Sequence, residues 1–122
     1  AKVAYIIHKH ERRDPTVGWT ETAKMLFESN ASIFSEHFGK PMGVIKEGAA
    51  ADLVILDYFP PTPLIPQNFL GHLIFGIRDN AVNTVIVDGK VVVKDHVLVT
   101  MDESGAMAEA RRVAESYWSK RS

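Results

Sequence analysis

Two histidines two positions apart, His8 and His10, are the residues whose type and spacing most directly suggest chemistry. On a β-strand, side chains at positions i and i+2 project from the same face, so this pair could hold one metal ion. On an α-helix the same side chains point about 200° apart around the axis and cannot share an ion. The element that carries the pair therefore decides whether it begins a metal site.

The residues around the pair favour a helix. The i, i+3, i+4, i+7 spacing of one helical face is followed by four residues, Val3, Ile6, Ile7 and His10. Basic residues at positions 12 and 13 suit a last helical turn, and Asp14-Pro15 would end it. The apolar run 3–7 is so short that periodicity also leaves a strand open.

His72 is a second candidate, placed between Gly71 and Leu73 after a proline-rich stretch. It could approach a substrate or a subunit interface in a larger protein. It could instead be a hydrogen-bonded side chain that shapes a loop, and this is the role that we favour.

The remaining polar candidates have simpler explanations. Asp52 and Asp57 resemble a catalytic carboxylate pair, but they flank one predicted strand and are too far apart to share a proton. His37 lies on a predicted helix beside Phe38, where it is either structural or exposed, and His96 lies in a predicted hairpin turn exposed to solvent. The segment 12–14 could bind an anion, although a cluster of surface ion pairs is the simpler interpretation.

The elements that must position these residues are helical at first. Helical periodicity extends from Trp19 to Phe38, with a break predicted at Ser29-Asn30, where Asn30 would cap a second helix. Gly39 has the conformational freedom to end that helix.

Strands follow. The apolar run between Asp52 and Asp57 predicts a buried strand, and the four prolines of residues 59–66 predict an extended loop. Asp88-Gly89 predicts a tight turn between strands 82–87 and 90–94, and a second turn leads into 97–99. A last helix would begin with a capping box formed by Thr100 and Glu103. The predicted class is α+β, because helices precede strands and a final helix.

Composition excludes several classes of protein. The chain has 122 residues, 46% of them hydrophobic, and a formal net charge of −1. This charge argues against a nucleic-acid partner, and no apolar run approaches the length of a membrane span. The absence of cysteine excludes disulfides and cysteine-ligated zinc, and we expect a cytoplasmic protein.

Two stretches in the second half carry a family resemblance. Residues 43–57, GVIKEGAAADLVILD, followed by residues 85–92, VIVDGKVV, resemble the C-terminal part of amidohydrolases, in the branch of chlorohydrolases and aminohydrolases. Three further stretches resemble the aminohydrolases associated with selenium metabolism: 8–15, 57–64 and 71–76. The resemblance implies helices from the end of a TIM-type barrel, part of a small β-sandwich and a C-terminal helix.

The same resemblance implies a divalent metal, zinc or iron, in the complete enzyme. Such an enzyme needs a His-x-His pair on the first barrel strand, two further histidines and an aspartate on the last strand. An eight-unit barrel takes about 200 residues or more, and the chain after His10 is much shorter. We therefore reject His8 and His10 as metal ligands, expect His10 to be partly buried and His8 solvated, and expect no catalytic residue in this chain.

The resulting prediction is the C-terminal portion of a metal-dependent amidohydrolase that hydrolyses a non-peptide C–N or similar bond in a small heterocycle. The start at Ala1, without methionine or a helix cap, supports a portion of a longer protein, and the missing metal ligands predict that this portion is inactive alone. The competing hypothesis is a non-catalytic α+β module for protein association. We expect three segments within one compact unit: 1–42 helical, 43–100 rich in strands and 101–122 helical. Exposed strand edges and apolar surface would favour a homo-oligomer.

Overall fold

The computed structural model describes residues 1–121, the side chain of Asp79 excepted. Its first element is helix α1, Lys2–Arg12, which confirms the predicted helix and excludes the strand interpretation of the histidine pair. The helix ends because Arg13 adopts a left-handed conformation, with φ 52°, and its N–H bonds back to the carbonyls of Lys9 and His10.

One continuous helical run follows a short loop. It consists of α2, Trp19–Lys24, the π-helical segment η1, Met25–Ser29, and α3, Asn30–Phe38. The predicted break at Ser29-Asn30 is wrong: Asn30 has helical angles, and its N–H bonds to the carbonyl of Met25 five residues earlier. A π-helical turn contains one residue more than an α-helical turn, so the helix continues through this segment without ending. The predicted end at Gly39 is confirmed, with φ 66°.

Four antiparallel strands form one sheet in the order β1-β2-β3-β4. Their bounds, which confirm the predicted strand regions, are β1 Leu53–Leu56, β2 Val82–Val87, β3 Lys90–Lys94 and β4 Val97–Leu98. The predicted burial of the first strand is wrong, because Val54 is 58% and Ile55 is 51% exposed. Asp88 and Gly89 both have positive φ, as do Asp95 and His96 in the second turn. Two consecutive left-handed residues match the twist of antiparallel strands, which is why both predicted turns form.

The segment between β1 and β2 combines the predicted loop with three short helices. Residues 57–66 form neither helix nor strand and bend at 61–62, and the helices are α4 Phe69–Gly71, η2 His72–Gly76 and η3 Asp79–Ala81. Asn68 holds the end of the loop, since its side chain accepts from the N–H of Ile65 and donates to the carbonyl of Pro63.

Three aromatic rings join the distant parts of the helical region. Tyr5 of α1 contacts Trp19 of α2 and Phe75 of η2 edge to face, with centroids 5.5 and 5.7 Å away, and the latter two rings are stacked. These contacts bring Tyr5 and Phe75, which are far apart in the sequence, next to each other. They set the orientation of α1 against its neighbours.

Few side chains are fully shielded from water. Within residues 1–121 the buried apolar residues are Ala50, Ile74 and Ala81, and the buried polar ones are Thr22 and His72. The predicted exposure of apolar surface is present, with Phe59 96% and Ile45 91% exposed. Within the same range, no helix is both long and apolar enough to cross a bilayer.

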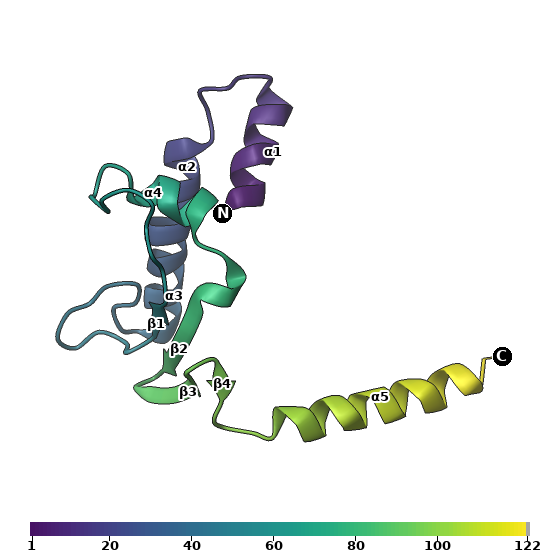
Figure 1. Ribbon diagram of the computed structural model, residues 1–122. Helices are drawn as coiled ribbons and strands as arrows, with labels where there is room; N and C mark the ends of the chain where they lie inside the picture. Colours follow the sequence, from purple (N-terminus) through teal and green to yellow (C-terminus); the bar gives the residue numbers. More distant parts are fainter. Residues whose placement is uncertain (122) are drawn as a thin grey trace.

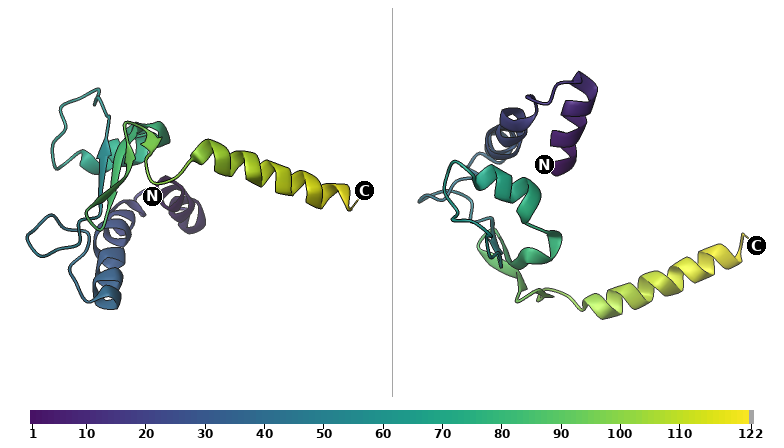
Figure 2. Two further views of the ribbon diagram at one scale, coloured as in Figure 1. Left: turned by 90° about the horizontal axis from the view of Figure 1, so that it is seen from below. Right: turned by 45° about the horizontal axis from the view of Figure 1, so that its top comes forward.

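The last helix, α5, spans Glu103–Ser119 and extends away from the other elements (Figures 1 and 2). Its cap differs from the prediction: Asp102, not Thr100, is the N-cap, and its carboxylate accepts from the N–H of Gly105. Asp102 lies directly before the first helical residue and so reaches the free N–H groups of the first turn. The division at residues 42 and 100 stays a prediction.

Candidate functional site

The two histidines of the opening pair point in different directions from α1. His8 is partly shielded and His10 is exposed, the reverse of the predicted arrangement. The face of α1 that packs inside this chain carries Tyr5 and His8, because the loop closes on it at Gly18. A Cβ at Gly18 would lie 3.1 Å from both the His8 Cβ and the Tyr5 carbonyl oxygen. The opposite face of α1, which carries Val3 and His10 and was predicted to be buried, is exposed: Val3 is 68% accessible.

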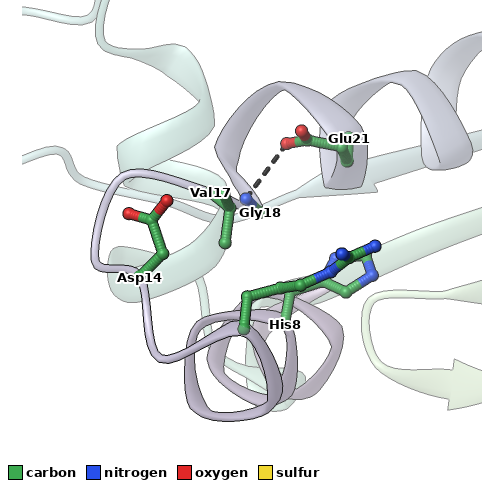
Figure 3. A pocket seen from close by; sticks show the side chains of 6 residues that line it. His8, Asp14, Val17, Gly18 and Glu21 are labelled. Atoms are coloured by element: carbon green, nitrogen blue, oxygen red, sulfur yellow. Dashed lines mark hydrogen bonds between the residues drawn. The ribbon is translucent and has the colours of Figure 1, made fainter.

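A cavity of about 480 Å³ lies beside His8. It is lined by residues of α1, the following loop and the start of α2: His8, Arg12, Asp14, Val17, Gly18 and Glu21 (Figure 3). The Glu21 carboxylate accepts from the N–H of Gly18 at 3.0 Å, and the His8 Nδ1 is buried without a hydrogen-bond partner in the described structure. The cavity is therefore lined by charges of both signs, and His8, one of its lining residues, also has a buried ring nitrogen without a partner.

Asp14 at the rim of this cavity is engaged in its own loop. Its carboxylate accepts from the hydroxyl and the backbone N–H of Thr16, at 2.6 and 2.8 Å. These bonds hold the pKa of Asp14 below its ordinary value of 3.8, and the bond from the hydroxyl contributes most to the lowering. The carboxylate thus stabilises the turn after α1, and Lys9 bonds to the carbonyl of Pro15 in the same turn.

A second polar cluster surrounds His72, which is 8% exposed. The Tyr58 hydroxyl lies 2.7 Å from its Nδ1 and the Thr62 hydroxyl 3.2 Å from its Nε2. A hydroxyl can donate or accept, so both ring nitrogens are satisfied in either tautomer. The adjacent cavity of about 400 Å³ is lined by the proline-rich loop and η2.

Gly76 is required by this cluster. A Cβ at this position would lie 2.2 Å from the Tyr58 hydroxyl oxygen, so only glycine admits the tyrosine. The sequence predicted no role for Tyr58, Thr62 and Gly76, although they lie in the stretches 57–64 and 71–76 that carry the family resemblance, because spacing along the chain does not show their contact with His72. The cluster matches the loop-shaping role favoured for His72, while a role toward a substrate or an interface stays a prediction.

The remaining candidates lie apart from both clusters. Asp52 accepts from the N–H of Asp88 at 2.7 Å, and Asp57 accepts from the Asn83 amide at 2.8 Å, so each carboxylate pins one end of β1. His96 is exposed in its turn and lies 3.3 Å from Asp57. His37 is exposed and meets the Phe38 ring edge to face.

The described histidines do not form a metal site by themselves. His8 and His10 diverge on α1, and both ring nitrogens of His72 already have hydroxyl partners. Among the residues that the structure describes, no three His, Asp or Glu side chains are grouped closely enough to bind one. The contacts of His72, Asp52 and Asp57 hold a loop and the ends of a strand in place.

Sequence comparisons agree with the amidohydrolase part of the resemblance noted above. The profile of the Amidohydrolase family matches residues 30–92, from α3 to β3. The 5-methylthioadenosine/S-adenosylhomocysteine deaminases of Thermococcus onnurineus and Dictyoglomus thermophilum are 38% and 34% identical over 97 and 109 residues. These matches cover 80% and 88% of this chain.

A third relative is the 5'-deoxyadenosine deaminase of Methanococcus maripaludis, 35% identical over 102 residues, or 84% of this chain. The matches cover 22%, 25% and 23% of the three relatives, so the chain spans about a quarter of their length. No solved structure matches the chain.

Proposed function

Because the chain belongs to the amidohydrolase family, we propose that it is the C-terminal portion of a deaminase that releases ammonia from a small adenosine-like heterocycle. The observation that carries this proposal is the similarity to deaminases named for adenosine-derived substrates, over most of this chain. The narrower resemblance to aminohydrolases associated with selenium metabolism stays a prediction about substrate.

Within such an enzyme, this chain contributes architecture rather than reacting groups. A family deaminase uses a divalent metal to activate water, and the described histidines do not fit that ion. The His72 nitrogens instead tie the loop at Tyr58 and Thr62 to η2. Asp52 and Asp57 hold the ends of β1 against the hairpin, so the sheet keeps its register.

A chimera tests the proposal. In the Thermococcus onnurineus deaminase, the matched segment is replaced by the corresponding 97 residues of this chain, and ammonia release from 5-methylthioadenosine is measured with added Zn²⁺. We expect the chimera to retain deamination and the isolated 122-residue chain to have none. The unmodified deaminase is the positive control, and a chimera with the same segment deleted is the negative one.

The opposite results are equally informative. A chimera that melts cooperatively and binds Zn²⁺ but releases no ammonia would contradict the proposal and favour a module for protein association. Ammonia release by the isolated chain would contradict the assignment of a purely architectural role.

A further inference from the structure

The turn between β2 and β3 is made by Asp88-Gly89, and the sequence contains no other Asp-Gly pair and no Asn-Gly pair. The main-chain nitrogen of glycine is the least shielded in a polypeptide, because glycine has no Cβ. After an aspartate, such a nitrogen can attack the side-chain carboxyl group and rearrange the backbone. The Asp88 side chain is 74% accessible to solvent, so water reaches this turn. The pair therefore has the chemistry of a spontaneous modification site.

The reaction needs no reagent other than water. The Gly89 nitrogen forms a bond to Cγ of Asp88, and the hydroxyl of the protonated carboxyl group leaves with the proton of that nitrogen as water. Water then opens the resulting succinimide ring. Attack at Cγ restores aspartate, whereas attack at the main-chain carbonyl carbon of Asp88 gives isoaspartate, in which the backbone runs through Cβ and Cγ. Water lost in the first step is regained in the second, and nothing is oxidised or reduced.

Two contacts oppose this reaction in the folded chain. The attacking nitrogen is engaged, because the N–H of Gly89 donates to the carbonyl of Ala51 at 3.0 Å. The carboxylate is engaged as well, because it accepts from Nζ of Lys40 at 2.9 Å. The hydrogen bond from Lys40, and then its charge, lower the pKa of Asp88 below its ordinary value of 3.8. Less of the protonated carboxyl group, which is the reactive form, is therefore present.

From these contacts we propose that Asp88-Gly89 is a latent isoaspartate site, which the Ala51 carbonyl and the Lys40 ammonium group keep unreactive in the folded chain. Both groups belong to the segment between α3 and β1, so the reaction begins when this segment separates from the hairpin. All of these groups lie within this chain, so their effect does not depend on what covers the surrounding surface. Isoaspartate adds a carbon to the backbone where two left-handed residues match the twist of the strands, so the modified turn no longer fits the hairpin.

The second hairpin turn provides an internal reference. Asp95 and His96 also have positive φ, and the N–H of His96 donates to the carbonyl of Asn83 at 3.0 Å. The nitrogen after Asp95 is shielded by a side chain, which the nitrogen of glycine lacks. We therefore expect modification at position 88 and not at position 95.

Ageing of the chain at neutral pH and physiological temperature tests the proposal. Isoaspartate at position 88 is measured by mass spectrometry with electron-transfer fragmentation, which distinguishes it from aspartate. We expect the folded chain to form it about tenfold more slowly than an unstructured peptide of residues 86–91, because the reaction requires local opening. Lys40→Met, which keeps the length of the side chain without its charge, should raise the rate about threefold. Lys46→Met is the matched control and leaves the rate unchanged, because Lys46 lies in the same segment and forms no ion pair within the described residues.

Hydrogen exchange of the Gly89 amide reports the contact with Ala51 without any modification. We expect this amide to exchange at least about tenfold more slowly in the folded chain than in the peptide. Exchange is followed by NMR in the wild-type chain before ageing.

Each of the following results would overturn the proposal. The first is isoaspartate at position 88 that forms as fast in the folded chain as in the peptide, or a peptide that forms none. The second is a Gly89 amide that exchanges at the rate of the peptide. The third is a Lys40→Met variant that reacts at the wild-type rate, or one whose modification rises equally at position 95, which would indicate a general loss of stability.

Discussion

His72 and His8 both lie partly or wholly out of solvent, yet the structure treats them differently. His72 is buried with a hydroxyl beside each ring nitrogen, and its neighbour Gly76 leaves room for that arrangement. His8 borders an open cavity and has a buried Nδ1 without a partner in the described structure. The comparison shows that burial alone does not reveal the role of a histidine. A buried histidine whose two ring nitrogens both have hydrogen-bond partners has a structural role, whereas a buried nitrogen without a partner is not explained by the contacts around it.

The largest effect should come from His72→Leu. Leucine fills similar space but leaves the Tyr58 hydroxyl without its partner, so we expect the free energy of unfolding to fall by about 2 kcal/mol. Urea unfolding followed by circular dichroism measures this change. An unfolding midpoint equal to that of the wild-type chain would show that the cluster does not stabilise the loop.

A smaller effect of about 1–2 kcal/mol is expected for Gly76→Ala, because the added methyl group overlaps the Tyr58 hydroxyl. In a Tyr58→Phe background that oxygen is absent, and the same substitution should cost less than half as much. The double-mutant cycle isolates this contact. Equal costs in the two backgrounds would place the strain elsewhere.

His8→Leu is the matched counterpart of His72→Leu and should change the unfolding free energy by less than about 1 kcal/mol, in the direction of higher stability. The reason is that the substitution removes a buried nitrogen that has no partner. The same urea titration applies. A loss as large as that of His72→Leu would erase the distinction between the two histidines.

The smallest effect concerns Asp14, beside His8. Thr16→Val removes the hydroxyl that contributes most to the lowered pKa of Asp14 and should raise that pKa toward 3.8. Because the pKa in the folded protein is lowered, the contribution of Asp14 to stability is present above pH 3.8. It is lost as the pH falls through the folded value. Carboxyl chemical shifts measured by NMR follow the titration, with Ser32→Ala as a distant control.

Local chemistry made much of the fold predictable. The two hairpin turns, the end of α3 at Gly39 and the proline-rich loop depend on the conformational preferences of one or two residues. The helix that carries His8 was favoured by the spacing of apolar residues over positions 3–10, although the sequence left a strand open. The π-helical segment at Met25–Ser29 was not, because Ser29-Asn30 suits a helix start as well as a helix interior, and the sequence pattern does not distinguish the two.

The candidate site was harder to predict from the sequence. Periodicity identified an apolar face of α1 but not the surface that covers it, so the burial of His8 and His10 was predicted in reverse. In the structure, the loop at Gly18 and the ring contacts of Tyr5 select the other face. The partners of His72 were missed for a related reason: hydroxyls on a proline-rich loop carry no pattern that points to a histidine on a following helix.

The sequence by itself determined the order of helices and strands, the tight turns and the membership of the amidohydrolase family, since these follow from short-range backbone preferences and residue identity. Only the tertiary structure decided that both ring nitrogens of His72 have hydrogen-bond partners and that Nδ1 of His8 has none. It also decided that α5 extends away from the other elements. These outcomes depend on distances between side chains far apart in the chain, which local preferences do not specify.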